Sequence, residues 1–166
     1  SMANAEPRQD TEVGTRIVTS LIRRTRQLDP TRPTITAMHG GWGGSFSLAH
    51  DIQGWNYRHS GYDAYHESHP EHAILGSETS SALTTRGEYV TDPVLGYMSA
   101  YDVNRPDWGA HAETAWQAIA DRPFMAGTFV WTGFDYRGEP TPYAWPCISS
   151  HVGIMDPCGF PKDNFW

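Results

Sequence analysis

The chain has 166 residues and a formal net charge of −7, and 39% of its residues are hydrophobic, which is enough for a packed core. Its twelve basic residues are eleven arginines and a single lysine, Lys162, and they form no basic stripe of the kind that binds nucleic acid. No run of about 18 apolar residues could cross a membrane, and the start lacks the basic and apolar regions of a signal peptide.

The chain opens with a helical pattern over residues 10–28, which the segment Asp-Pro-Thr-Arg-Pro at residues 29–33 ends. Apolar residues spaced for one face of this helix are Val13, Ile17, Leu21 and Leu28. Three strands are predicted next, at residues 34–38, 51–57 and 72–78. A glycine-rich loop at residues 39–44 follows the first of them, and a short helix around residues 62–68 follows the second.

The second half begins with a long irregular stretch, residues 79–106, and stretches of this length are usually functional. A helix is predicted at residues 108–121, with Trp116 and Ile119 among its apolar positions. Residues 124–131 are nearly all apolar, as in a fully buried parallel strand. The alternation of strands and helices indicates an α/β fold.

Each predicted strand ends in a polar or aromatic cluster, and in a parallel barrel the active site lies at these carboxyl ends. Asn56 and Tyr57 end one strand, Glu78 ends the next, and Trp131 ends the last. Seven Trp and eight Tyr, many beside Gly, Asn or Asp, are typical of a surface that stacks on sugar rings, although large core residues would give the same count.

Glycoside hydrolysis needs two carboxyl groups beside the scissile bond, held by rigid elements. Glu78 is the best candidate, because it follows an apolar strand directly and has small polar neighbours. On position alone, an ordinary loop carboxylate is an equal alternative.

Three motifs carry a resemblance that decides between these readings. Residues 74–81 read Ile-Leu-Gly-Ser-Glu-Thr-Ser-Ser, residues 129–140 read Phe-Val-Trp-Thr-Gly-Phe-Asp-Tyr-Arg-Gly-Glu-Pro, and residues 150–156 read Ser-His-Val-Gly-Ile-Met-Asp. In this order they resemble the nucleophile strand, the last barrel strand and the following stretch of β-galactosidase-like members of glycoside hydrolase family 2. The resemblance implies that residues 1–166 are the C-terminal half of a (β/α)8 TIM barrel, about strands 4–8, truncated at both ends within a larger multidomain enzyme.

The resemblance also implies a retaining double displacement, most like that of a β-galactosidase, with Glu78 as nucleophile. Tyr57 matches the tyrosine whose hydroxyl bonds the nucleophile, and Trp131 matches the floor of the sugar subsite. Asn4 matches the asparagine that contacts the sugar 2-hydroxyl. Asn56 and Asp135 are further expected substrate contacts.

One departure from the family pattern concerns the acid/base glutamate, which follows that asparagine in the family. The chain reads Ser-Met-Ala-Asn-Ala-Glu-Pro at residues 1–7, so Ala5 holds the position of the glutamate. An engineered knockout, a naturally disabled copy and an artefact all remain open. Without the acid, roughly 10²–10⁴-fold of the rate should be lost, and this fragment alone is expected to be inactive.

Other site classes fit less well. The histidines of residues 66–72 have the wrong spacing for a helical metal site, and residues 40–44 lack the lysine and hydroxyl residue of a phosphate loop. No metal ligands are predicted in the chain and no cofactor, although a metal ion in the intact enzyme is left open. A non-catalytic carbohydrate-binding barrel is the non-enzyme alternative, and β-glucuronidase and β-mannosidase are the alternatives within the family.

The expected partners are a β-galactoside-type carbohydrate and, because a half-barrel has two unpaired edges, the remainder of the parent chain or a second copy. No nucleic acid or membrane partner is expected. Cys147 and Cys158 suit reduced thiols as well as a disulfide. The compartment is therefore left open for a soluble protein, with the periplasm or secretion as the expectation.

Overall fold

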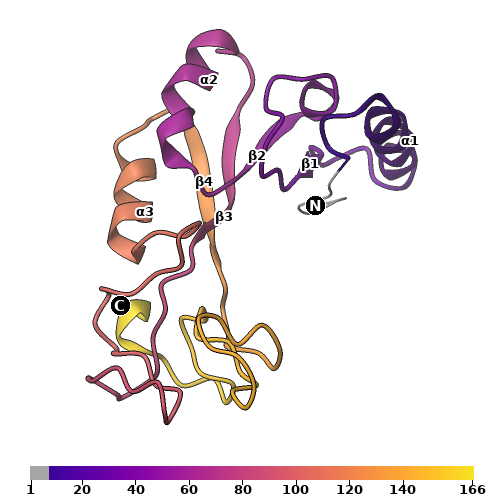
Figure 1. The fold of residues 1–166 in the computed structure, drawn as a ribbon. Coiled ribbons are helices and arrows are strands. Elements are labelled where there is room, and N and C mark those ends of the chain that lie inside the picture. The colour runs from indigo at the N-terminus through magenta and orange to yellow at the C-terminus, as the bar shows by residue number, and fades with distance from the viewer. Residues whose placement is uncertain (1–7) are drawn as a thin grey trace. The chain divides into compact units, whose positions relative to one another are not determined.

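A computed structural model describes residues 8–166, which fold as an α/β protein with one four-stranded sheet (Figure 1). The α-helices are α1 (Glu12–Leu28), α2 (Tyr62–Ser68) and α3 (Ala112–Ala120). The strands are β1 (Ile35–Thr36), β2 (Ile52–Asn56), β3 (Ile74–Ser80) and β4 (Met125–Trp131). Short 3-10 helices are η1 (Ser47–Ala49), η2 (His59–Gly61) and η3 (Asp163–Phe165).

The chain divides into two compact units. Among the described residues, the first comprises 8–78 and 119–128, and the second comprises 79–118 and 129–166. The sheet has the order β1-β2-β3-β4, and the pairs β1/β2 and β2/β3 are parallel. The predicted α/β class with a parallel sheet is therefore confirmed, and the four predicted strands all form.

Helix α1 begins at an N-cap in which the Thr11 hydroxyl accepts a hydrogen bond from the Gly14 amide, 3.0 Å away. Its buried face carries Gly14, Val18 and Ile22. The apolar face predicted from the sequence is not the face that is buried. Its four members are all at least 41% exposed: Val13, Ile17, Leu21 and Leu28. Two helical stripes, one residue apart, are both apolar in this sequence, and packing selects the one that contains glycine. A side chain at Gly14 would collide with the Arg8 carbonyl.

The core of the first unit forms where α1 packs on the segment that follows β1. Val18 and Ile22 of the helix contact Met38 and Phe46, and all four are buried. Trp42 and Ala49 pack against this cluster. The predicted loop at residues 39–44 is thereby fixed on one side by the helix, and it leads into the 3-10 helix η1 rather than into an α-helix.

Four predicted elements differ in extent or burial, one of them β3, which begins and ends two residues later than expected. β1 has two residues instead of five, and the Ala37 carbonyl that follows it accepts a hydrogen bond from the Gln9 side chain at 2.8 Å. Helix α3 begins at Ala112, four residues late, since a turn at Pro106 precedes it. β4 was expected to be fully buried, but Phe129 is 64% exposed.

The second unit is built largely from loops. Leu83, Met98 and Val152 form its buried cluster, and Trp131, Tyr136 and Tyr143 pack against it. Most of this unit's first segment has no regular secondary structure, as predicted, and it is held by backbone hydrogen bonds such as Thr85 to Met98.

The single lysine lies in the centre of this second unit. The Lys162 Nζ atom donates to Asp135 Oδ2 at 2.6 Å, and it also donates to the carbonyls of Thr84 and His151. Both side chains of the ion pair are buried. Burial raises the pKa of Asp135 and lowers the pKa of Lys162, so loss of water outweighs the attraction between them.

Several questions that the sequence left open have answers in the structure. Cys147 and Cys158 are free thiols. In the histidine-rich segment, His66 stacks on Phe124, His69 stacks on Tyr65, and His72 bonds the Tyr65 hydroxyl. None of the helices within residues 8–166 has the length and apolar character needed to span a membrane.

Stability should fall at acidic pH because of His151. Burial and, secondly, the neighbouring Lys162 lower the pKa of His151 to about 4. The unfolded chain, with a histidine pKa near 6.5, therefore binds more protons than the folded chain, so stability present above pH ~6.5 is lost as the pH falls toward ~4. We expect the His151 contribution to be about 2–3 kcal/mol across this window. Denaturant unfolding at pH 7 and pH 5 measures it, and an unchanged pH slope in a His151→Gln variant would contradict the assignment.

Candidate active site

The carboxyl ends of β2 and β3 meet at a bulge. Trp55 pairs with Gly76, but the next residue, Asn56, pairs with Glu78, so Ser77 is the extra residue. The Ser77 hydroxyl donates to Asn56 Oδ1 at 2.8 Å and occupies the polar end of that buried side chain. Bulges re-aim the side chain that follows them and are common next to active sites. Here the re-aimed residue is Glu78.

The chain leaves β2 through two residues in the left-handed region. Tyr57 has φ 54° and Arg58 has φ 47°, a conformation that costs free energy for residues other than glycine. The Tyr57 amide donates to the Glu78 carbonyl at 2.8 Å. This bond fixes the backbone of Tyr57 beside that of Glu78, and the two residues predicted to act together therefore lie at adjacent strand ends.

Within the described part of the chain, one carboxylate oxygen of Glu78 lacks a partner at this edge of the sheet, as does the indole nitrogen of Trp55. The Glu78 atom is Oε1, which is buried and has no hydrogen-bond partner among residues 8–166. A buried polar atom without a partner costs about 1–3 kcal/mol and calls for an explanation. A ligand that donates to this carboxylate would supply the missing partner.

The other predicted site residues are distributed as follows. Asn56 lies beside Glu78 and is 3% exposed. Asn4 and Ala5 lie outside the described residues. Trp131 belongs to the second unit, where its carbonyl accepts from Ser81 and its ring lies edge-on to Tyr136.

Asp135 also belongs to the second unit, and its carboxylate has structural partners. One oxygen pairs with Lys162 and the other accepts from the Gly153 amide at 2.8 Å. These contacts give Asp135 a part in the unit's core that the sequence did not indicate. Its contact with sugar hydroxyls stays a prediction.

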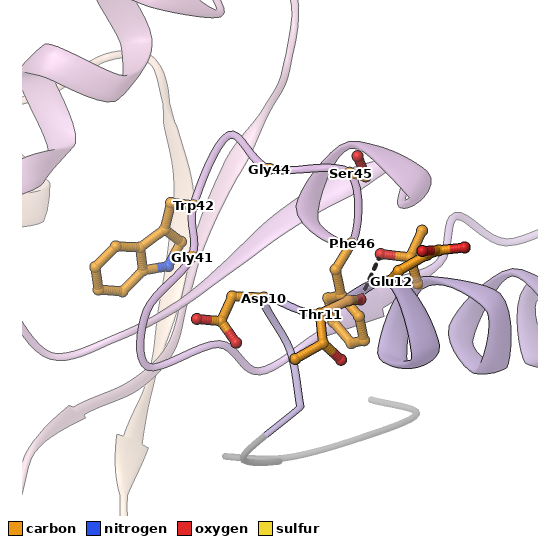
Figure 2. A pocket seen from close by; sticks show the side chains of 9 residues that line it. Asp10, Thr11, Glu12, Gly41, Trp42, Gly44, Ser45 and Phe46 are labelled. Carbon is orange, nitrogen blue, oxygen red and sulfur yellow. Dashed lines mark hydrogen bonds between the residues drawn. The ribbon is translucent and has the colours of Figure 1, made fainter.

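An aromatic pair that was not predicted from the sequence lies next to the bulge. Trp42, from the glycine-rich loop that lines the pocket in Figure 2, stacks on Trp55 of β2 with ring centroids 3.9 Å apart and planes 3° apart. The sequence signal for this pair is a tryptophan between two glycines. Because glycine has no side chain to cover the indole ring, the ring packs against a more distant part of the chain. As to metals, the side chains of residues 8–166 include no group of three or more His, Cys, Asp or Glu arranged as ligands.

This arrangement places one carboxylate, with an oxygen that has no hydrogen-bond partner within residues 8–166, near the carboxyl edge of a parallel sheet. A carboxylate in this position can attack an electrophilic carbon or accept a proton. The pairing of β3, the bulge and the hydrogen bond from the Tyr57 amide fix the backbone that carries it.

Comparison with known proteins gives sequence relatives that are glycosidases. No family model matches the chain. It is 33% identical over 173 residues to the β-galactosidase BoGH2A of Bacteroides ovatus, an alignment that covers 93% of this chain and 20% of that enzyme. It is also 33% identical over 126 residues to a β-glucuronidase of Bacteroides fragilis, covering 67% of this chain and 17% of that enzyme. The chain thus spans about a fifth of these relatives.

The fold agrees with solved structures of the same kind. A family 2 β-galacturonidase from Eisenbergiella tayi, solved with galacturonate, superposes with a TM-score of 0.73 at 18% identity. The match covers 98% of this chain and 30% of that one. The solved structure shows the fold. The sequence relatives show that the chain belongs to glycoside hydrolase family 2, and it corresponds to part of the length of the members that it matches.

Proposed function

We propose that this chain carries the nucleophile of a retaining glycoside hydrolase that acts on O-glycosyl bonds of β-galactosides. The observation that carries the proposal is the buried, unpartnered oxygen of Glu78 at a bulged strand end. Membership of a glycoside hydrolase family supports the reaction class, and the β-galactosidase of Bacteroides ovatus supports the sugar. The four strands would then be part of a (β/α)8 barrel completed by other residues of the protein.

The reaction would proceed in two displacements. A Glu78 oxygen forms a bond to the anomeric carbon while the glycosidic C–O bond breaks, and the leaving group departs with a proton from a general acid or from water. Water then attacks the anomeric carbon, its O–H proton passes to solvent or a base, and the Glu78 carboxylate is released. Two inversions give net retention.

Within this reaction, the roles of the neighbouring residues follow from the family resemblance. We assign to the Tyr57 hydroxyl a hydrogen bond with the nucleophile, and to Asn4 a contact with the 2-hydroxyl of the sugar. Trp131 forms the floor of the sugar subsite. Asn56 and Asp135 would contact further hydroxyls. A β-glucuronidase is the second candidate, favoured by the Bacteroides fragilis relative, and it needs a cation for the sugar carboxylate.

The experiment that tests the function follows the stereochemistry of hydrolysis by proton NMR. The full-length protein is given aryl β-galactosides, β-glucuronides and β-mannosides. We expect the β-galactoside to be hydrolysed fastest, with the β-anomer of galactose appearing first. Release of the α-anomer first would exclude a covalent intermediate on Glu78, and faster hydrolysis of the glucuronide would move the specificity to the second candidate.

Restoring a glutamate at position 5 should increase activity, by an amount that depends on the leaving group. For alkyl β-galactosides, whose leaving oxygen must be protonated, Ala5→Glu should raise kcat/KM roughly 10²–10⁴-fold. For dinitrophenyl β-galactoside, whose leaving group departs as an anion, the gain should be small. Steady-state kinetics across a leaving-group series gives both numbers. An equal gain for every leaving group would mean that position 5 does not carry the acid.

A non-catalytic carbohydrate-binding role is the alternative that Ala5 favours. It predicts sugar binding without turnover even for dinitrophenyl glycosides. The same leaving-group series therefore separates the two functions.

A further inference from the structure

The motif at residues 129–140 contains a tyrosine and a glutamate that the reaction above does not use. Tyr136 and Glu139 follow Trp131 in the second unit, and the Tyr136 hydroxyl donates a hydrogen bond to Glu139 Oε2. The Tyr136 ring lies edge-on to the Trp131 ring, with centroids 6.4 Å apart and planes 79° apart. The three side chains therefore form a connected series that begins at the proposed floor of the sugar subsite.

The Tyr136 oxygen interacts with both of its neighbours. A tyrosine hydroxyl has one proton to donate, and its oxygen can also accept. Tyr136 donates its proton to the Glu139 carboxylate, and its oxygen accepts a hydrogen bond from the Trp131 side chain. Because an ionised carboxylate only accepts, Glu139 fixes the direction of the hydroxyl proton and leaves the lone pairs of the oxygen to the indole N–H.

The protonation state of Tyr136 gives these hydrogen bonds one direction. Burial raises the pKa of Tyr136 to about 12, and the hydrogen bond to Glu139 acts in the same direction. The hydrogen bond from Trp131 acts to lower this pKa and does not outweigh the other two effects. The phenol therefore keeps its proton at neutral pH, and the donors run from Trp131 through Tyr136 to Glu139.

The backbone holds Tyr136 in place and turns Glu139 back toward it. The Tyr136 amide donates to Ser150 Oγ at 3.1 Å, and the Tyr136 carbonyl accepts from the Ser150 amide at 2.8 Å. Gly138 and Glu139 have φ values of 100° and 40°. A glutamate in the left-handed region costs free energy, and such residues cluster at sites that hold ligands. This turn brings the Glu139 carboxylate to the Tyr136 hydroxyl.

The main chain of Trp131 is fixed separately from its ring. Its carbonyl accepts from Ser81 Oγ at 3.1 Å, and the Thr132 amide donates to the Val152 carbonyl at 3.1 Å. The half-buried side chain of Trp131 packs against the buried cluster of the second unit, and apolar packing has no preferred direction. The contact with Tyr136 adds a directional bond, which sets how the indole ring is tilted.

We infer that Tyr136 is a positioning residue for Trp131 and that Glu139 orients Tyr136. The inference rests on the proposed function, which makes Trp131 the floor of the sugar subsite. Stacking on an aromatic ring depends on the angle of that ring. The affinity for sugar should therefore depend on two side chains that act through Trp131.

Calorimetric titration of the full-length protein with isopropyl β-thiogalactoside, which is not hydrolysed, measures this dependence. Tyr136→Phe removes the hydroxyl and keeps the ring, and we expect it to raise the Kd about tenfold. The same change in a Trp131→Ala background should have no further effect, because the ring that it positions is gone. Glu139→Ala should raise the Kd by a similar factor, and Glu139→Gln, whose amide oxygen accepts the hydroxyl proton, should restore most of the affinity.

The matched control is Tyr143→Phe. Tyr143 packs against the same buried cluster, but its hydroxyl donates to the Tyr97 carbonyl at 2.7 Å. This variant should leave the Kd unchanged. An equal loss in Tyr143→Phe, or an equal effect of Tyr136→Phe with and without the Trp131 ring, would overturn the inference and leave the proposed function in place.

Fluorine NMR reports on the Trp131 ring in the absence of sugar. In full-length protein labelled with fluorotryptophan, the Trp131 resonance is the one that disappears in a Trp131→Phe variant. Tyr136→Phe and Glu139→Ala should shift or broaden this resonance, and Tyr143→Phe should not. An unmoved resonance in Tyr136→Phe would overturn the positioning role. If the resonance moves as expected but the parent protein binds no thiogalactoside, the positioning role stands and the proposed function is lost.

Discussion

Replacing Glu78 with glutamine is expected to lower kcat on dinitrophenyl β-galactoside by about 10⁴-fold or more, because the residue supplies the atom that bonds to the sugar. Glutamine keeps the size of the side chain, so the bulge at Ser77 and the backbone bond from Tyr57 should remain. An activated leaving group is essential, since it isolates the loss of the nucleophile from the absence of a general acid at position 5.

The matched control is Glu71→Gln. Glu71 is exposed and precedes the same strand, so this variant makes the same chemical change outside the proposed site. It should keep wild-type kcat. Comparable losses in the two variants, or residual activity above about one hundredth in Glu78→Gln, would contradict the assignment. Unfolding midpoints of both variants show whether either loss reflects folding.

Replacing Lys162 with methionine is expected to destabilise the second unit by about 3–5 kcal/mol, because it leaves the buried Asp135 carboxylate without its counter-ion. The Thr84 carbonyl would lose a donor as well. Removing both charges should behave differently. Burial raises the pKa of Asp135 and lowers that of Lys162, so the pair is already costly to bury, and Lys162→Met with Asp135→Leu should recover most of the loss.

The control for this prediction is the pair between Arg86 and Asp156, in which Arg86 is 49% exposed. Arg86→Met should cost at most about 1 kcal/mol, since exposed ion pairs contribute little. Denaturant unfolding of the wild type and the three variants gives the comparison. A double variant as unstable as Lys162→Met alone would mean that the ion pair stabilises the fold by more than its burial costs.

Much of the fold was predictable because its signals are local. The strand that carries Glu78 begins as an apolar run and has polar residues after it, and a run of this kind can be recognised from a few neighbouring residues. Helix α2 likewise formed where expected, at Tyr62–Ser68. The strand-end position of Glu78 required only that pattern and the rule that parallel strands place their carboxyl ends together.

What could not be predicted depends on contacts between distant residues. The buried face of α1 was assigned wrongly because both of its apolar stripes have helical spacing, and only packing on Met38 and Phe46 selects one. The bulge at Ser77 is set by the pairing of two strands, which no single strand encodes. The hydrogen bond from the Gln9 side chain to the Ala37 carbonyl joins residues 28 positions apart, and Gln9 carries no local signal for it.

The chemical identity of the site residues was predicted through resemblance rather than geometry. Asp135 illustrates the limit, because a carboxylate after a strand suits a sugar contact and a structural ion pair equally well. Its partner Lys162 lies 27 positions further along the chain, and only the folded second unit brings them together.

The most direct test of the central claim is to trap the glycosyl-enzyme. A 2-fluoro β-galactoside with a dinitrophenyl leaving group slows the second displacement more than the first, so the full-length protein should gain one fluorogalactosyl group. Peptide mapping by mass spectrometry is expected to place that group on the peptide that contains Glu78, and Glu78→Gln should abolish labelling. A label on a peptide that lacks Glu78 would contradict the account.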